Sequence, residues 1–168
     1  SYTAVDGSGK TANCTFTVTV NSTALTVQLD SVFINCDSAI QTISVDVTID
    51  NFQDIIGLQF SVQWDPAVLQ FDTVNNDYPG LNLMPSDFLG FVSTPGGVLR
   101  FLAGNAVNGW PTNIPDDAVL FTIVFNVLQP DALSNLVFLG PFDAVDNTFN
   151  SVPLVTIDGN FQIVDTTP

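Results

Sequence analysis

The chain contains no histidine and no glutamate, and only Lys10 and Arg100 among its 168 residues are basic. Without histidine, the Ser-His and Cys-His pairs that activate a catalytic nucleophile cannot form. Zinc sites usually take about four Cys or His ligands, so a chain with two cysteines and no histidine does not provide one. These absences exclude a nucleophilic triad and argue against a zinc protein.

The acidic residues are 17 Asp, which give the chain a formal net charge of -15. A surface with this charge repels the phosphates of nucleic acids and the head groups of anionic lipids. No apolar run has the length of a membrane span, and no basic segment followed by an apolar one opens the chain. The composition therefore predicts no nucleic-acid partner and no membrane insertion, and we expect a mature soluble segment.

The balance of residue types favours strands over helices. Helices prefer Glu, Lys and Ala, whereas Thr and Val suit strands and Asn and Asp suit turns. The scarcity of Lys and Arg also leaves few cleavage sites for trypsin-like proteases, which suits a durable protein outside the cell. We therefore predict an all-β extracellular protein, secreted or on the cell surface.

Short alternations of apolar and polar residues recur along the chain, with turn residues between them. Three runs are expected to bury one face each: Leu25, Val27 and Leu29; Ile43, Val45, Val47 and Ile49; and Leu58, Phe60, Val62 and Trp64. A change of phase at Asp30-Ser31 indicates a β-bulge before Val32 and Ile34. Residues 118–128 are apolar on both alternations, which indicates a central strand covered on both faces.

Two further strands are expected over residues 87–94 and 98–104, joined by the turn Pro95-Gly96-Gly97. No segment keeps a helical period. Short strands at this regular spacing predict a jelly-roll or immunoglobulin-like β-sandwich of about nine strands. We assign residues 22–168 to this sandwich.

Residues 1–21 are predicted to form a β-hairpin extension around Gly7-Ser8-Gly9. A hairpin alone cannot bury its apolar side, so we expect it to lie against a sandwich. The hairpin either folds back on its own chain or adds its strands to a neighbouring copy, as in β-augmentation. The predicted interface residues are Tyr2, Cys14, Phe16, Val18 and Val20.

Cys14 and Cys36 are the only cysteines, and in a secreted β-protein they are predicted to form a disulfide. Within one chain this bond closes a loop of roughly 20 residues, worth about 3 kcal/mol in the chain-entropy model. A bond between neighbouring chains and two buried free thiols are the alternatives.

The Asp-rich loops offer candidates for catalysis and for calcium. A pair of glycosidase carboxylates could come from Asp116-Asp117 or from Asp143 with Asp146. However, Asp beside Pro and Asn in β-loops ordinarily forms turns, so we predict no enzyme. Residues 72–77 and similar loops carry oxygen ligands but lack the Asp-x-Asp-x-Asp-Gly spacing of a calcium loop. We predict no cofactor, with calcium left open.

Short motifs predict glycans, which also occur outside the cell. Four matches to an Asp-(Ser/Thr)-small-apolar pattern give the O-glycosylation candidates Ser31, Ser38, Thr73 and Thr166. Asn13 and Asn21 each begin an N-glycosylation sequon.

Aromatic residues offer a possible carbohydrate platform. Trp110 and Tyr78 lie in expected loops where a sugar ring could stack on them, whereas Trp64 belongs to a strand and is expected in the core. A carbohydrate-binding module is therefore one alternative function.

Residues 25–164 resemble the cohesin family, the receptor modules of cellulosomes and related surface proteins. The resembling stretches are IIGLQFSVQWDPAVLQFDTV, GGVLRFLAGNA, DDAVLFTIVFNVL and VPLVTIDGNFQIV. This resemblance implies a nine-stranded jelly-roll sandwich that binds dockerin modules through one sheet face.

The opening SYTAVDGSGKTANCTFTVTV resembles something different, the final hairpin of a hyalin-repeat domain. Such domains are immunoglobulin-like adhesion modules that end in Tyr-Thr-Ala-x-Asp followed by Asn-Cys-Thr-Phe-Thr-Val. The rest of such a domain is missing here, including the usual partner of its cysteine. The hairpin therefore cannot form a self-contained hyalin-repeat fold.

Together these features predict a non-catalytic, extracellular structural or adhesive module that associates with protein, above all with copies of itself. A hairpin donated from each subunit to the next makes a head-to-tail contact that does not close, and this generates a filament. The alternative is a receptor module for a dockerin-like partner within a larger multidomain surface protein.

Overall fold

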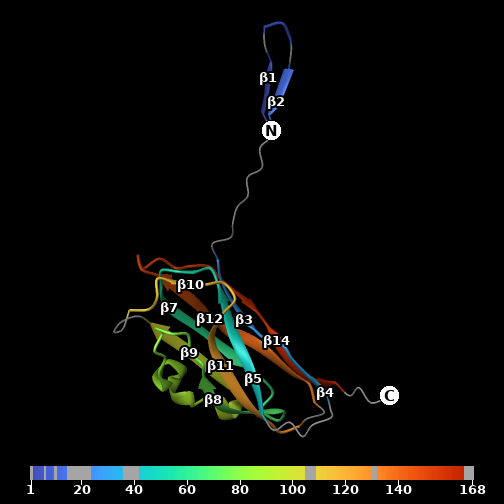
Figure 1. Cartoon of the computed structure of the whole chain (residues 1–168), viewed down its shortest axis with the longest axis vertical. Coiled ribbons are helices and arrows are strands. Elements are labelled where there is room, and N and C mark those ends of the chain that lie inside the picture. The colour runs from blue at the N-terminus through green and yellow to red at the C-terminus, as the bar shows by residue number, and fades with distance from the viewer. Residues whose placement is uncertain are drawn as a thin grey trace.

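The computed structural model describes residues 2–5, 7–9, 11–14, 24–35, 42–104, 109–129 and 132–164. Most of these residues form two five-stranded sheets that pack on each other as a β-sandwich (Figure 1). The predicted all-β sandwich is confirmed. No helix in these ranges is long and apolar enough to cross a membrane.

The first sheet contains the strands that the sequence marks most clearly. Its order is β13 (Leu154–Ile157), β3 (Leu25–Leu29), β5 (Thr42–Asp50), β11 (Ala118–Val127) and β8 (Leu69–Asn75). Only the β13–β3 pair is parallel. All seven apolar residues predicted to point inward from β3 and β5 are buried, which confirms that periodicity.

The second sheet packs against the first. Its order is β4 (Val32–Asn35), β14 (Gly159–Val164), β12 (Ser134–Asp146), β7 (Ile55–Gln63) and β9 (Val98–Gly104). The β14–β4 pair is parallel and the other pairs are antiparallel. A short pair, β6 (Phe52–Gln53) with β10 (Asn113–Ile114), lies at one end of the sandwich.

Aromatic rings fill the space between the two sheets. The Phe60 ring lies 5.0 Å from Phe101 and 6.2 Å from Phe121, measured between centroids. Trp64 is buried as predicted, and its indole Nε1 donates a hydrogen bond of 2.9 Å to the Leu69 carbonyl. Such edge-to-face and offset contacts add to the hydrophobic stabilisation of a core.

The change of phase at Asp30-Ser31 is a switch between sheets, so the predicted β-bulge is wrong. β3 ends at Leu29 in the first sheet, and β4 begins at Val32 in the second. A chain that leaves one sheet for the other changes which side faces the core, and this gives the same sequence signal as a bulge. Gly159 packs against the backbone at this switch, where a Cβ on residue 159 would lie only 2.5 Å from the Asp30 carbonyl oxygen, so a larger residue does not fit.

The strand predicted over residues 87–94 is also wrong, because this stretch forms the 3₁₀ helices η1 (Pro85–Phe91) and η2 (Thr94–Gly96). Pro85 starts η1, and the Asp87 carboxylate accepts a hydrogen bond of 2.7 Å from the Met84 N–H. Leu89 and Phe91 have φ angles of 49° and 60°, which extended strands do not adopt.

The expected central strand over residues 118–128 is β11, which lies between β5 and β8. A register shift between Val119 and Phe121 turns both Leu120 and Phe121 into the core. The opposite side is covered only in part, since Val124 is half-buried and Leu128 is 50% exposed. The position of the strand is confirmed, and its burial on both faces is confirmed for part of its length.

The predicted hairpin is present as β1 (Tyr2–Val5) and β2 (Thr11–Cys14), which pair antiparallel with Tyr2 opposite Cys14. These two strands form a sheet of their own, and Figure 1 shows this sheet apart from the sandwich. Phe16, Val18 and Val20 lie outside the described residues. Their expected docking therefore stays a prediction.

Candidate docking face

The acidic loop residues that were considered as catalytic candidates hold turns. Asp116 Oδ1 accepts a hydrogen bond of 2.9 Å from the Asn51 N–H, and Asp50 Oδ1 accepts one of 2.8 Å from the Asp117 N–H. These two bonds tie the loop before β11 to the end of β5. Asp116 therefore has a structural role between two loops that lie far apart in the sequence.

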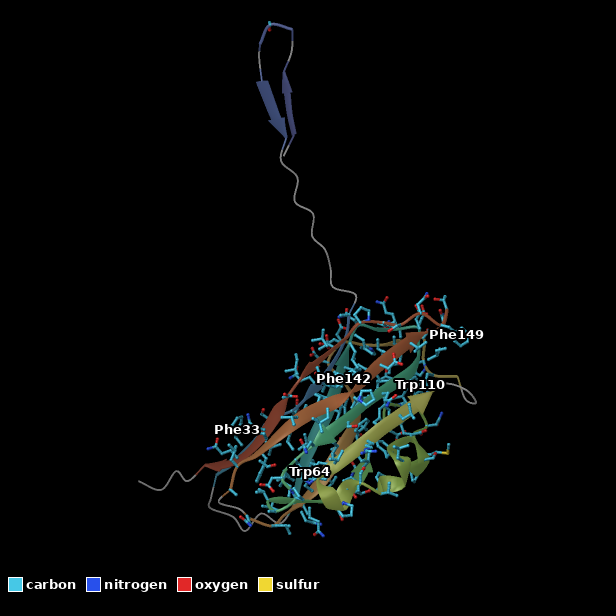
Figure 2. All side chains as sticks on the ribbon, turned by 180° about the vertical axis from the view of Figure 1, so that it is seen from behind. Phe33, Trp64, Trp110, Phe142 and Phe149 are labelled. Carbon is cyan, nitrogen blue, oxygen red and sulfur yellow. The ribbon has the colours of Figure 1, made fainter. Side chains whose placement is uncertain are left out.

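Asp146 stabilises the turn that follows β12. Its Oδ1 accepts hydrogen bonds from the Thr148 and Asn150 backbone N–H groups, at 2.8 and 2.9 Å, and from Thr148 Oγ1 at 2.7 Å. The Asn150 N–H and the Thr148 hydroxyl are the main donors that lower the pKa of Asp146. This turn presents Phe149, which is 82% exposed, to solvent (Figure 2).

The side chains of residues 72–77, considered as calcium ligands, do not surround a common position. Among the described residues, no three Cys or Asp side chains lie close enough together to hold a metal ion. Asp72 is exposed on β8, and the side chain of Asn76 instead donates to Thr122 Oγ1 at 3.3 Å.

Trp110 is buried, so the prediction that it forms an exposed sugar platform is wrong. Its ring lies 6.1 Å from the ring of Phe52, which is fully buried at the β6–β10 end of the sandwich (Figure 2). Tyr78 is half-buried and packs against the core. The loop position of Trp110 was read correctly, but loop residues that cap the end of a sandwich can point into it.

The predicted modification sites fall in different places. Ser31 and Thr73 are exposed, although the Ser31 hydroxyl also accepts a hydrogen bond of 3.2 Å from the Asn160 N–H. Ser38, Thr166 and Cys36 lie outside the described residues, and Cys14 is the last residue of β2. Glycosylation and the disulfide therefore stay predictions.

The outward side of β12, β7 and β9 differs in character from the rest of the surface. We call it the β9 face, and the strand pairing arranges it in four rows: Val137, Gln63 and Val98; Leu139, Ser61 and Arg100; Asp143, Gln59 and Leu102; and Val145, Gly57 and Gly104. Leu102 is 48% exposed. Arg100 and Asp143 are the only charged residues in these rows.

The β9 face has a raised border on each side, one formed by the chain near Pro141 and the other by η1, and hollows lie on the face. The β12–β7 register breaks between Leu139 and Asp143, where the Gly140–Pro141 peptide is cis and Phe142 is 45% exposed (Figure 2). On the other side, Leu89 projects from η1. The hollow between them measures about 420 Å³, and a second one of about 280 Å³ adjoins it over Gly57 and Gly104.

The outward side of β5, in the middle of the other sheet, is polar, whereas the edge strand β13 exposes Val155 and Ile157. The outward side of β5 presents Ser44, Asp46, Thr48 and Asp50, and Asp46 Oδ1 accepts a hydrogen bond of 2.6 Å from Thr122 Oγ1. At its end, partial burial and then the nearby Asp46 charge raise the pKa of Asp30. These three carboxylates thus lie away from the β9 face, whose rows contain a single Asp. The cores of protein interfaces are likewise depleted of charge.

Sequence reasoning did not single out the residues of the β9 face. Leu102 occupies an outward position of β9, and Leu139 and Val145 occupy outward positions of β12, two strands for which no inward or outward residues were predicted. A usable signal existed, because the outward positions of β5 carry Ser44, Asp46, Thr48 and Asp50 in place of apolar residues. The outward bulge at Pro141 could not be predicted from periodicity.

A family model described as the cohesin domain matches residues 37–163. Among solved structures, a cohesin of Clostridium thermocellum in a complex named Coh-OlpA-Doc918 superposes with a TM-score of 0.65 at 20% identity, covering 84% of this chain and 99% of that one. The sixth cohesin of Acetivibrio cellulolyticus scaffoldin B, solved with a Cel5 dockerin, gives 0.64 at 17% identity with the same coverage.

A non-cellulosomal cohesin from the archaeon Archaeoglobus fulgidus is also similar, with a TM-score of 0.61 at 21% identity over 84% of this chain and 91% of that one. No curated protein sequence matches the chain. The structural likenesses concern the sandwich, and the resemblance of residues 1–21 to a hyalin-repeat hairpin stays a prediction.

Proposed function

The chain belongs to the cohesin domain family, and we propose that it is a non-catalytic protein-binding module that receives a dockerin-like partner on its β9 face. The observation that carries the proposal is the contrast between the two outward sheet surfaces. The first sheet is polar and acidic along its central strand β5, whereas the β9 face carries only Arg100 and Asp143 as charged residues, is partly apolar and is hollowed. Cohesins solved with dockerins share this sandwich, which supports a partner of that kind.

The β9 face has the composition that a protein partner needs. A partner can cover the half-buried Val137, Leu139 and Val145 and the exposed Leu102 at a modest desolvation cost. Asp143 is the one carboxylate among the rows of this face. The polar Gln59, Gln63 and Ser61 can give the orienting hydrogen bonds. We place this module outside the cell, on the cell surface or in a secreted assembly.

The test is a binding screen with a panel of dockerin modules displayed on yeast. Dockerins that bind the native chain should lose at least about tenfold in affinity with Leu102→Asp, because a buried unpaired carboxylate weakens an interface. The matched control is Val124→Asp, which places the same charge on the outward side of β11 and should leave affinity nearly unchanged. Binders that respond to the control and ignore Leu102→Asp would contradict the proposal.

A second candidate function is self-assembly through the N-terminal hairpin. The observation that favours it is that β1 and β2 form a two-stranded sheet of their own, and among the described strands they pair only with each other. A two-stranded hairpin is marginally stable in water by itself, so it gains from a sheet edge on another copy. Deleting residues 1–21 should then abolish polymers seen by negative-stain imaging, and polymers that persist would defeat this candidate.

A further inference from the structure

The outer edge of β4 is open to another strand. β4 pairs through its inner side with β14, and no described residue pairs with its outer side. Its residues Val32–Asn35 contain no charge, no proline and no bulge, which are the usual protections of an edge strand. Phe33 stands on this strand with 63% exposure, near one end of the sandwich (Figure 2).

Two other sheet edges carry protection within the strand or beside it. β9 carries Arg100 and is flanked by η1, whose Phe88 ring lies 5.3 Å from the ring of Phe101. β8 carries Asp72 at a register shift in its pairing with β11. The four residues of β13 are uncharged, but Pro153 directly precedes this strand and Asp158 directly follows it. The β4 edge and its exposed Phe33 therefore invite pairing more than β8 and β9 do.

We propose that β2 of one copy adds to the β4 edge of the next copy, parallel to β4, and that Cys14 and Cys36 then bond across the joint. This inference rests on the self-assembly candidate described above. It would extend the second sheet to β1, β2, β4, β14, β12, β7 and β9, with the first two strands from the neighbour. In this arrangement the free edge of β2 and the free edge of β4 pair with each other.

The positions of the cysteines in the sequence select the parallel direction. Cys14 ends β2, and Cys36 comes directly after Asn35, which ends β4. Parallel pairing brings these two strand ends together, whereas antiparallel pairing would place them at opposite ends. Neighbouring strands lie about 4.8 Å apart, within the roughly 4.4–6.8 Å that separates the Cα atoms of a disulfide.

If β2 paired with β4 of its own chain, the segment between Cys14 and Ala24 would have to be almost fully extended. From Ala24 to the end of β4 at Asn35 the strands advance by about 36 Å, at about 3.3 Å per residue. Ten residue steps separate Cys14 from Ala24, and they span at most about 36 Å when fully extended. A hairpin from a second copy has no such constraint, so the occupant of the β4 edge is another copy.

Bond formation is a two-electron oxidation. The Cys14 and Cys36 thiols lose their protons, one S–S bond forms, and a low-molecular-weight disulfide such as oxidised glutathione takes the two electrons and leaves as two thiols. Each copy uses Cys14 toward one neighbour and Cys36 toward the other. The product is a covalent head-to-tail chain.

The test mixes two single-cysteine variants of the full chain in a buffer with oxidised glutathione. The native chain should give a ladder on a non-reducing gel that dithiothreitol removes. Cys14→Ser and Cys36→Ser should each stay monomeric alone. Their equal mixture should give a dimer and nothing larger, because one Cys14 meets one Cys36 and no further thiol is available.

A charge on the edge provides a second readout that does not depend on sulfur chemistry. Phe33→Lys, introduced into both partners of the mixture, should slow dimer formation at least about tenfold by protecting the edge. The matched control is Val155→Lys on β13, which should leave the rate nearly unchanged. Fluorescence of the buried Trp64 checks that every variant is folded.

The proposal is overturned if the mixture yields no dimer, if Cys36→Ser alone forms one, or if the oxidised native chain is a monomer lighter by two hydrogens. Light scattering of the native chain without oxidant separates two kinds of failure. Polymers there, without dimer in the mixture, would contradict the β4 joint and leave self-assembly standing. Monomers in both would contradict self-assembly as well.

Discussion

Gly97 shows how one residue fixes the turn between η2 and β9. Its φ is 75°, and a Cβ at this position would lie 2.5 Å from the Trp64 carbonyl oxygen and 2.8 Å from Pro66 Cδ. The Gly97 carbonyl also accepts the Trp64 N–H at 3.0 Å. The sequence predicted this turn from Pro95-Gly96-Gly97, but not the packing of Gly97 against β7.

We expect Gly97→Ala to lower the free energy of unfolding by about 1–3 kcal/mol, since it adds both backbone strain and a clash. The matched control is Gly96→Ala, where nothing lies within 4 Å of the added Cβ. Urea unfolding followed by Trp64 fluorescence measures both. Equal losses in the two variants would contradict the assigned role of Gly97.

Asp146 gives the fold a dependence on pH at its exposed turn. Hydrogen bonds to its ionised form lower its pKa below the ordinary 3.8. The stabilisation is therefore present above the pKa of the unfolded chain and is lost as the pH falls through the lower pKa of the folded chain. We expect Asp146→Asn to melt at a lower temperature than the native chain at pH 7.

This difference in melting temperature should shrink as the pH falls through the lowered pKa of Asp146, because the protonated carboxyl is then neutral like the Asn amide. Asp143→Asn, on the same strand but outside the turn, is the control for the loss of one negative charge. A difference that stays constant across the pH range would show that the Asp146 carboxylate does not act through its ionised form.

At the scale of elements, alternation predicted the strands whose two sides have different surroundings. β3, β5 and β7 follow it because one side meets the core and the other meets solvent. It failed for η1, whose apolar residues Phe88, Leu89 and Phe91 could be read as a strand. The positive φ angles of Leu89 and Phe91 depend on local backbone and packing, which periodicity does not encode.

η1 covers the core beside β9 and so supports the border of the β9 face. The Phe88 ring lies 5.3 Å from Phe101 and 5.2 Å from Phe121. We expect Phe88→Ala to cost about 3–5 kcal/mol of unfolding free energy, as truncation of a buried aromatic does. Phe149→Ala, at an 82% exposed position, should change it by less than about 0.5 kcal/mol in the same measurement.

A loss of similar size at both positions would mean that η1 adds no more to the core than an exposed turn does.

The β9 face could not be predicted from periodicity, for a different reason. Its character depends on which outward positions from three strands become neighbours, and that follows from the sheet order. The separation of Arg100 and Asp143 by one intervening strand could be stated only once β7 was placed between β9 and β12.

At the scale of the whole molecule, the hairpin and the sandwich are separable. Among the described strands β1 and β2 pair only with each other, so we expect a chain without residues 1–21 to keep its melting temperature within about 2 °C. Differential scanning calorimetry of the two chains, each diluted until it is monomeric, makes the comparison. A large drop would mean that the hairpin lies against its own sandwich.

The acidic character of the chain acts on partners at this scale too. A net charge of -15 repels other copies at a distance, so self-assembly through the β4 edge should speed up when salt screens the charges. A dockerin-like partner on the β9 face meets little of this charge locally. The two proposed contacts therefore use different parts of the second sheet and do not exclude each other.

The central claim is that the β9 face receives the protein partner. Methyl chemical-shift mapping of the 18.0 kDa chain during titration with a dockerin from the screen tests it most directly. The account predicts that the methyl signals of Leu102, Leu139 and Val145 shift while those of Val124 stay in place. Shifts confined to Val124 and its neighbours on the outward side of β11 would contradict it.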